Sequence, residues 1–301
     1  MVGMAVRRKS IREGSILFDI LNYCLLILLA FVIAYPLYYM LIISLSDGRA
    51  VTRGDVSLFP IGFSLATYKV ILKDPYIAIA YKNTLIYTFL GTFINVSMTA
   101  LCAYPLSRSK FYGRTVLTGI VLFTMFFEGG IIPNYLVADS LGLVNTMWAI
   151  VLPPAISVWY MIIMRTFFQQ IPNEIHESGY MDGANDLQIF WKIVLPLSIP
   201  VLATMILFYS VWHWNSFFPA ILYLNDKELY PVQIIMRNMV IQGDISATQG
   251  AAAEASAAGA NITGLNIKYA VIFVTILPIL AVYPFIQKYF VKGMMVGSLK
   301  G

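Results

Sequence analysis

An aromatic and polar cluster, YSVWHWNSFFPA, lies inside an apolar stretch of the sequence. Aromatic faces pack against the apolar faces of sugar rings and amides bind hydroxyl groups, so tryptophan beside asparagine suits a saccharide. Helical spacing places Trp212 near Asn215 and Ser216. His213 and Trp214 point in other directions, so the cluster cannot all face one cavity. Two interpretations remain open: a substrate path lined by the Trp212 face or the His213 face, or packing between helices with satisfied polar groups.

Glu128, in the segment FFEGGIIPNY, is a second candidate for a polar path. Charged groups at membrane depth usually face protein or a water-filled cavity. The alternative is a residue at a helix end near the outer interface, because Gly129 and Gly130 can end the helix here. We favour the interface.

The sequence holds no pattern that is typical of catalysis. It has no GxxxxGK[ST] phosphate loop and no HExxH zinc motif, and its two histidines, His176 and His213, lie far apart. Cys24 and Cys102 both lie in apolar stretches without CxxC spacing, which is typical of buried thiols. We therefore predict no catalytic site, metal site or cofactor in this chain.

The composition is that of a membrane protein. Hydrophobic residues make up 59% of the 301 residues and charged residues 12%, whereas soluble domains carry about 25% charged residues. This excludes a soluble enzyme and a disordered chain. The net charge of +5 bears on orientation in the membrane. It does not predict nucleic acid binding, because the basic residues are scattered between apolar segments.

Six apolar stretches have the length of a membrane-crossing helix, about 20 residues. They cover residues 16–45, 84–106, 116–135, 147–168, 197–224 and 269–290. We expect the prolines inside them, such as Pro36 and the pair Pro153-Pro154, to be tolerated, since neighbouring helices and waters satisfy the freed carbonyls. The prediction is an all-α polytopic membrane protein whose residues 1–301 form one transmembrane domain.

The basic residues predict which side faces the cytoplasm. Arg108, Lys110 and Arg114 crowd the short second connection, and the basic N-terminus leads into a long apolar run without a cleavage site. Positive charge favours the cytoplasmic side, so we expect both termini inside and an uncleaved signal anchor. Residues 46–80 and 225–268 then form outer loops. The second includes the low-complexity stretch SATQGAAAEASAAGANITG and is predicted to be mobile.

The inner connection 165–196 differs from the others because it carries four carboxylates against two cations, a net charge of −2. Such a loop predicts a protein partner. Its local signals predict a helix–turn–helix, in which Asn173 caps a first helix with Glu174 and Glu177 in its first turn. Gly183 leaves that helix in the left-handed conformation. Asn185 or Asp186 then caps an apolar second helix.

This loop resembles a known family motif. The spacing of Glu-Ser-Gly, then Gly after three residues, then Ile-x-Leu-Pro after nine more is similar to the cytoplasmic coupling loop of bacterial ABC importer permeases. The segment DGANDLQIFWKIVLPLSIPVLAT looks closest to the oligosaccharide branch, with its maltose-type second permease and polysaccharide-uptake relatives. The resemblance extends over nearly the whole chain. The matching residues are Glu177, Ser178, Gly179, Asp182, Gly183, Ala184, Ile193, Leu195 and Pro196.

One departure concerns the residues after the glutamate, where the family commonly has two alanines and this chain has Ser178 and Gly179. Their small volume still permits close docking of the two helices. Glycine is expected to weaken the first helix by about 0.5–1 kcal/mol relative to alanine.

The resemblance implies an ABC importer permease fold and a set of partners. The loop would sit in a groove of an ATPase subunit, where Glu177 faces basic groups, Gly183 holds the turn and the second helix transmits closure. ATP and Mg would be bound by that subunit. Two ATPase subunits, a second homologous permease, an extracytoplasmic solute-binding protein, an oligosaccharide and membrane lipid are the implied partners. The binding protein is expected to contact residues 225–268. For the tail 291–301 two interpretations remain open: it reaches between the ATPases, or Lys292 and Lys300 serve as cytoplasmic anchors.

The implied location is the bacterial cytoplasmic membrane, crossed several times. The alternative function is an ion-coupled secondary transporter of a small polar solute. That class favours intramembrane carboxylates and repeated halves. The sequence shows no convincing internal repeat, and it does not identify the sugar.

Overall fold

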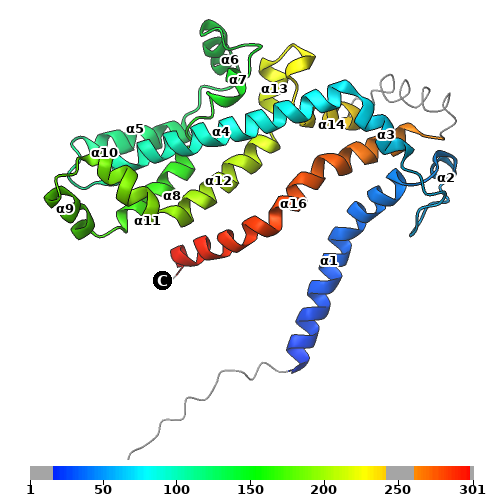
Figure 1. Cartoon of the computed structure of the whole chain (residues 1–301), viewed down its shortest axis with the longest axis horizontal. Helices are drawn as coiled ribbons and strands as arrows, with labels where there is room; N and C mark the ends of the chain where they lie inside the picture. Colours follow the sequence, from blue (N-terminus) through cyan, green and yellow to red (C-terminus); the bar gives the residue numbers. More distant parts are fainter. Residues whose placement is uncertain (1–15, 242–260, 299–301) are drawn as a thin grey trace, which may run out of the picture.

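The computed structural model describes residues 16–241 and 261–298, and the side chains of residues 18–238 and 261–282. The described residues form helices without strands, as expected for an all-α protein (Figure 1). The predicted basic N-terminal segment and most of the low-complexity stretch lie outside them.

The chain begins with a long apolar helix, α1 (Ile16–Ser44), which contains Pro36. Only 11% of its most apolar window is buried, so its surface faces lipid or another chain. Two short helices follow, α2 (Gly48–Arg53) and α3 (Ala66–Lys73). They fold the first connection back against the start of the next long helix.

The central element is α4 (Pro75–Ser107), which extends the predicted second span at its N-terminal end. It begins sharply because the Asp74 carboxylate accepts a hydrogen bond from the backbone N–H of Tyr76, and Pro75 suits the first turn. α4 runs from α3 at one end of the molecule to α9 and α10 at the other (Figure 1).

The third and fourth spans are broken, and the continuous helices predicted over 116–135 and 147–168 are wrong in this respect. The chain bends by 115° between α5 (Arg114–Phe126) and α6 (Ile131–Ser140). Gly130 lies between them with φ +87°, a conformation that favours glycine. α7 (Trp148–Val151) and α8 (Val158–Gln169) are separated by a segment that holds Pro153-Pro154. Proline lacks an N–H and clashes with the preceding turn, so this pair ends the helix.

The inner connection contains α9 (Asn173–Met181), α10 (Asp186–Ile189), a π-helical turn η1 (Phe190–Val194) and α11 (Leu195–Leu197). After a bend of 82° the chain continues into α12 (Ile199–Trp214). The predicted fifth span, 197–224, is not one helix. α12 ends at Trp214, and residues 215–217 separate it from α13 (Phe218–Tyr223).

The predicted outer loop 225–268 is partly helical. It contains the turn η2 (Lys227–Leu229), α14 (Val232–Ile241) and the beginning of α16 (Gly264–Ser298). Residues 242–260 lie outside the described part. α16 is longer than the predicted sixth span and takes in residues 291–298 of the predicted tail.

The helices pack around α4, which contacts α8 and α12, while α16 contacts α12 and α1. The largest apolar cluster joins α4, α8, α10, η1 and α12. Its fully buried members include Ala103, Met161, Met164, Val194 and Met205. This cluster connects the inner loop directly to the spans, so the loop cannot shift without disturbing their packing.

By length and composition, three described helices can cross a membrane: α1, α4 and the 264–282 part of α16. The number rises to five when each bent pair, α5 with α6 and α10–α11 with α12, is taken as one span. The six-span count stays a prediction.

Candidate functional site

The turn of the inner loop has the geometry that Gly183 predicted. Gly183 has φ +78° and ends α9. Its N–H donates to Tyr180 O at 3.0 Å, and Ala184 N–H donates to Gly179 O at 3.0 Å. These two bonds form a Schellman motif, which satisfies the last carbonyls of a helix and reverses the chain.

The second helix is capped by Asn185 rather than Asp186. Asn185 Oδ1 accepts from Gln188 N–H at 2.8 Å, and Gln188 Oε1 accepts from Asn185 N–H at 2.9 Å. This reciprocal capping box stabilises the start of α10. The turn therefore has both sides fixed by hydrogen bonds within the loop.

The predicted cap at the start of the first helix is wrong. Asn173 is already the first helical residue, and Pro172 occupies the capping position with φ −55° and ψ 141°. Proline's ring fixes φ near −65°, so the chain enters the helix there without a side-chain cap. Glu174 lies in the first turn, where its charge suits the helix dipole.

The two faces of α9 have different roles. Glu177, Ser178 and, just after the helix, Asp182 and Gly183 are exposed. On the opposite face, His176 and Gly179 are buried. The exposed face carries the acidic residues of the motif, so it is free to contact another protein.

Gly179 permits α9 to lie unusually close to the second helix. An added Cβ at this position would lie 3.0 Å from Ile189 Cγ1 and 3.3 Å from Ile193 Cδ1. Such distances are shorter than ordinary van der Waals contact. The glycine that was expected only to weaken α9 is therefore also the residue that allows this packing.

The buried face of the loop is held by aromatic rings. Tyr104 on α4 lies between the loop helices, with its ring centroid 6.3 Å from that of His176 and 4.9 Å from that of Phe190. Ile189, Phe190 and Val194 are buried, whereas Leu187 and Trp191 are exposed. Of the remaining motif residues, Ala184, Ile193 and Leu195 are half-buried and Pro196 is exposed.

Two polar contacts secure the loop further. Arg165 Nε–H on α8 donates to Leu106 O at 2.9 Å, which places a cation at the C-terminal end of α4. The Tyr180 hydroxyl donates to the Asp186 carboxylate across the turn. That bond to a carboxylate raises the pKa of Tyr180.

Burial lowers the pKa of His176, and the nearby charge of Arg108 lowers it further. Nδ1 of this ring is buried without a hydrogen-bond partner in the described part of the chain. The geometry therefore holds His176 as a neutral packing residue of the loop.

The candidate path residues on α12 do not converge. His213 is buried against α4, where a Cβ on Gly91 would overlap with the His213 ring. Trp212 is 40% exposed. Asn215 is exposed, and its amide donates to Val211 O of its own helix at 2.8 Å. Ser216 is buried, and its Oγ has no partner among the described residues.

Glu128 is exposed and lies in the break between α5 and α6. This position agrees with the helix-end interpretation of Glu128. The described spans bury no carboxylate at all.

A polar network that sequence reasoning missed joins α12, α4 and the break before α8. His213 Nε2 lies 2.6 Å from Asn95 Oδ1, and the Asn95 amide donates to Pro154 O. One turn further on, Thr99 Oγ1 and the Tyr209 hydroxyl lie 2.7 Å apart, and Tyr209 accepts from Ser157 N–H at 3.1 Å. The sequence signal for this network is a four-residue spacing of small or polar residues along α4, at Gly91, Asn95 and Thr99. This spacing places them on one face of the helix.

A mostly apolar groove of about 760 Å³ lies between α4, α12 and α16. Phe89, Phe93 and Trp214 are among its lining residues. Trp212, Asn215 and Ser216 are not, so the predicted sugar-binding face and this groove are separate. Among the described residues no group of His, Cys, Asp or Glu could hold a metal ion.

Comparisons with known proteins agree with this arrangement. The chain matches the family described as "Binding-protein-dependent transport system inner membrane component" over residues 2–296. A relative from Bacillus subtilis (strain 168), the "Polygalacturonan/rhamnogalacturonan transport system permease protein YtcP", is 43% identical over 288 residues, covering 95% of this chain and 99% of the relative. "Protein LplC" of the same organism is 41% identical over 284 residues, covering 94% and 95%.

A solved structure has the same fold. It belongs to a bacterial ABC transporter "involved in the import of the acidic polysaccharide alginate". The TM-score is 0.86 at 33% sequence identity, and the match covers 96% of this chain and 100% of that one. The fold is that of an ABC importer permease in the cytoplasmic membrane, whose ATPase is a separate subunit. The chain therefore belongs to the family of inner membrane components of binding-protein-dependent transport systems.

Proposed function

We propose that the chain is the permease subunit of an ATP-driven importer of oligosaccharides, and that its inner loop couples ATPase closure to alternating access. The observation that carries this proposal is the two-faced loop. Its acidic exposed face, with Glu177 and Asp182, is available to an ATPase subunit. Its buried face, with His176 and Gly179, packs on Tyr104 and Ile189.

A movement that the ATPase imposes on the exposed face of α9 would be transmitted to the membrane spans, because no flexible segment lies between them. The Schellman turn and the capping box fix α9 relative to α10. The π-turn then continues through α11 to the bend before α12, and its buried residues belong to the same apolar cluster as α4 and α8. ATP and Mg would be bound by the ATPase partners, two per transporter, which this loop contacts.

The names of relatives support a saccharide substrate. They include transport permeases for polygalacturonan and rhamnogalacturonan, for trehalose and maltose, and the alginate importer. Of these three proteins, the polygalacturonan/rhamnogalacturonan permease and the alginate importer have the higher sequence identity to this chain. Both names refer to polymers that contain uronic acids, so an acidic oligosaccharide is the first substrate to test. Trp212, Asn215 and Ser216 stay the proposed sugar contacts, and His213 becomes a packing residue of the path wall.

A second, homologous permease would complete the transporter. The apolar surface of α1 and the groove between α4, α12 and α16 offer lipid or helix contacts that this chain alone does not fill. We propose six crossings with both termini inside, which places α9 and α10 in the cytoplasm and α2, α3 and α14 outside.

Reconstitution tests this function. The chain is coexpressed with a candidate second permease and ATPase, inserted into proteoliposomes and supplied with candidate binding proteins and saccharides. We expect ATP hydrolysis to rise only when binding protein and its sugar are both present. Sugar uptake that ceases with an uncoupler while internal ATP is held constant would instead support ion-coupled transport.

The sugar contacts need a separate measurement. Trp212→Ala should alter uptake kinetics while ATPase assembly is retained. Thr204→Val is the matched control, because Thr204 is half-buried on the same helix and its hydroxyl donates only to Pro200 O of that helix. Unchanged uptake in Trp212→Ala would remove this residue from the path.

A further inference from the structure

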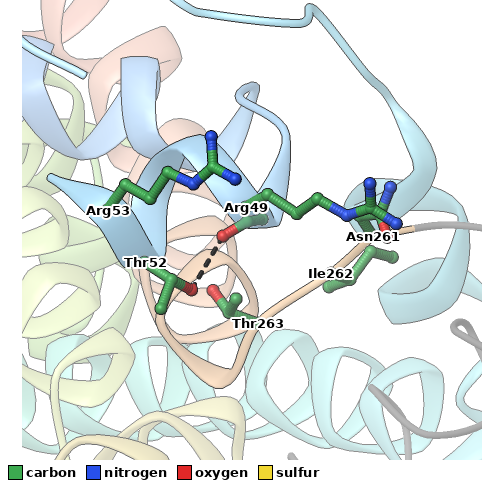
Figure 2. Close-up of a pocket in the computed structure, with 7 residues that line it drawn as sticks. Arg49, Thr52, Arg53, Asn261, Ile262 and Thr263 are labelled. Atoms are coloured by element: carbon green, nitrogen blue, oxygen red, sulfur yellow. Dashed lines mark hydrogen bonds between the residues drawn. The ribbon is translucent and has the colours of Figure 1, made fainter. Parts of the chain in front are cut away.

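A small basic pocket lies at the end of the molecule opposite the inner loop. It has a volume of about 310 Å³ and forms where α2 meets the segment just before α16. Figure 2 shows Arg49 and Arg53 extending from α2 in different directions, with the Arg49 side chain running toward Asn261. Ile262 and Thr263 also line the pocket. It shares no lining residue with the apolar groove.

The floor of the pocket is fixed by close backbone contact. Gly48 N–H donates to Asn261 O at 2.8 Å, and a Cβ on Gly48 would lie 2.7 Å from that oxygen. Thr52 Oγ1 donates to Gly48 O at 2.8 Å. The buried amide of Asn266 donates to Ile43 O at 2.7 Å, which joins the start of α16 to the end of α1. The pocket is therefore preformed.

The two arginines carry charge that this part of the chain does not neutralise. Arg49 and Arg53 are exposed and four residues apart, so they lie on one face of α2 and repel each other. Neither forms an ion pair within the described residues. The nearby Asp47 carboxylate caps α2 by accepting from Arg49 N–H. In the proposed orientation these two arginines lie on the outer side of the membrane, whereas basic residues are generally more frequent in cytoplasmic loops.

We propose that this pocket is a docking point for the solute-binding protein, and that Arg49 and Arg53 attract carboxylates on that protein. Guanidinium groups bind carboxylates through two parallel hydrogen bonds, so a carboxylate is the partner group that these arginines suit best. The pocket also adjoins the end of the 225–268 connection. The inference rests on the proposed function, because it requires a binding protein on this side.

The pocket joins the segments next to α1 and α16, so a protein bound there can affect both helices. Its walls come from α2, directly after α1, and from the residues that lead into α16. A protein held there contacts the outer ends of two packed spans at once. Docking would therefore be sensed by both helices.

The test uses the reconstituted complex and the binding protein that stimulates its ATP hydrolysis. The affinity of the binding protein is measured for the unaltered complex and for Arg49→Glu, Arg53→Glu and Arg49→Gln. We expect each charge reversal to raise Kd at least tenfold and Arg49→Gln to raise it less. Added salt should weaken binding to the unaltered complex more than to Arg49→Gln. Lys73→Glu, an exposed basic residue of α3 outside the pocket, is the matched control and should change Kd less than twofold.

Several outcomes would overturn the proposal. An unchanged Kd in both reversals, or an equal loss in Lys73→Glu, would remove the pocket from the interface. Saturable binding of free galacturonate to the complex without binding protein, lost in Arg49→Glu, would assign the pocket to sugar instead. Copurification of the ATPase subunits with each variant shows that it is folded. If no binding protein stimulates the unaltered complex, the proposed function itself fails, which is a separate result.

Discussion

His213 Nε2 on α12 lies 2.6 Å from Asn95 Oδ1 on α4, although the two residues are 118 positions apart. Because the Asn95 amide donates to Pro154 O, its Oδ1 is the acceptor for the His213 N–H. Nε2 of His213 therefore carries a proton. Asn95 thus links α4 to α12 and to the break between α7 and α8.

This pair predicts a measurable coupling energy. Asn95→Leu and His213→Phe should each lower Tm of the purified complex, and the double variant should lose less than the sum. Interhelical hydrogen bonds in membranes give coupling energies of about 0.6–1.7 kcal/mol, which is the expected range. The control cycle pairs Asn95→Leu with Thr204→Val, which shares no partner. Additive losses in the first cycle would contradict the hydrogen bond.

Gly183 predicts an effect that comes from the backbone alone. Its φ is +78°, but nothing lies within 4 Å of an added Cβ. Gly183→Val should therefore strain the turn by about 1–2 kcal/mol through its own backbone, because its Cβ meets no neighbouring part of the loop. We expect the protein to insert normally while sugar uptake falls relative to ATP hydrolysis. Gly183→Asn is the control, because asparagine tolerates this conformation. Normal uptake by Gly183→Val would argue against a role of the turn in coupling.

A substitution at Gly179 is predicted to act through steric crowding and not through backbone conformation. Alanine is the better helix former by about 0.5–1 kcal/mol, but its Cβ would meet Ile189 Cγ1 at 3.0 Å. We expect Gly179→Ala to lower Tm and to cost less in an Ile189→Ala background. Ser178→Ala is the control on the exposed face of the same helix. A higher Tm for Gly179→Ala alone would show that the two helices can separate at no cost.

His176 predicts that the loop loses stability in acid. Its pKa is lowered in the folded protein, so below about pH 6.5 the unfolded loop binds a proton more readily than the packed loop does. The stabilisation is present above the unfolded pKa and is lost as the pH falls. The affinity of the ATPase subunits, measured from pH 7.5 to 5.5, should drop in the unaltered protein. His176→Phe keeps an aromatic ring beside Tyr104 and should drop less. Equal losses would exclude His176 as the cause.

Local signals in the loop could be predicted from the sequence. Gly183 and Asn185 act through hydrogen bonds to residues three to five positions away, so their roles depend on neighbours in the chain. Asn173 was assigned wrongly because Pro172 can set the same helix start through its fixed φ. The family resemblance rested on the spacing of Glu177, Gly183 and the Ile-x-Leu-Pro segment, and the comparisons confirm the family.

Long-range relationships could not be predicted. The sequence shows the pair Pro153-Pro154, but it does not distinguish prolines tolerated within a helix from prolines that break it. In the structure the helix is broken there, and Asn95 on α4 donates a hydrogen bond to Pro154 O. The position of His213 depends on the small size of Gly91 on another helix. Hydropathy reports length and composition, and it contains no information on which face meets which neighbour.

The π-turn of residues 190–194 has a consequence for insertions and deletions. A π-turn holds one residue more than an α-turn, and one α-helical residue corresponds to a rotation of about 100°. Removing any single residue from FWKIV would leave a regular helix of the same apolar character. It would also rotate α9 and α10 about the helix axis relative to α12, and the acidic face would point away from its partner. Relatives that couple through this loop are therefore expected to vary in side chains here but to conserve the number of residues.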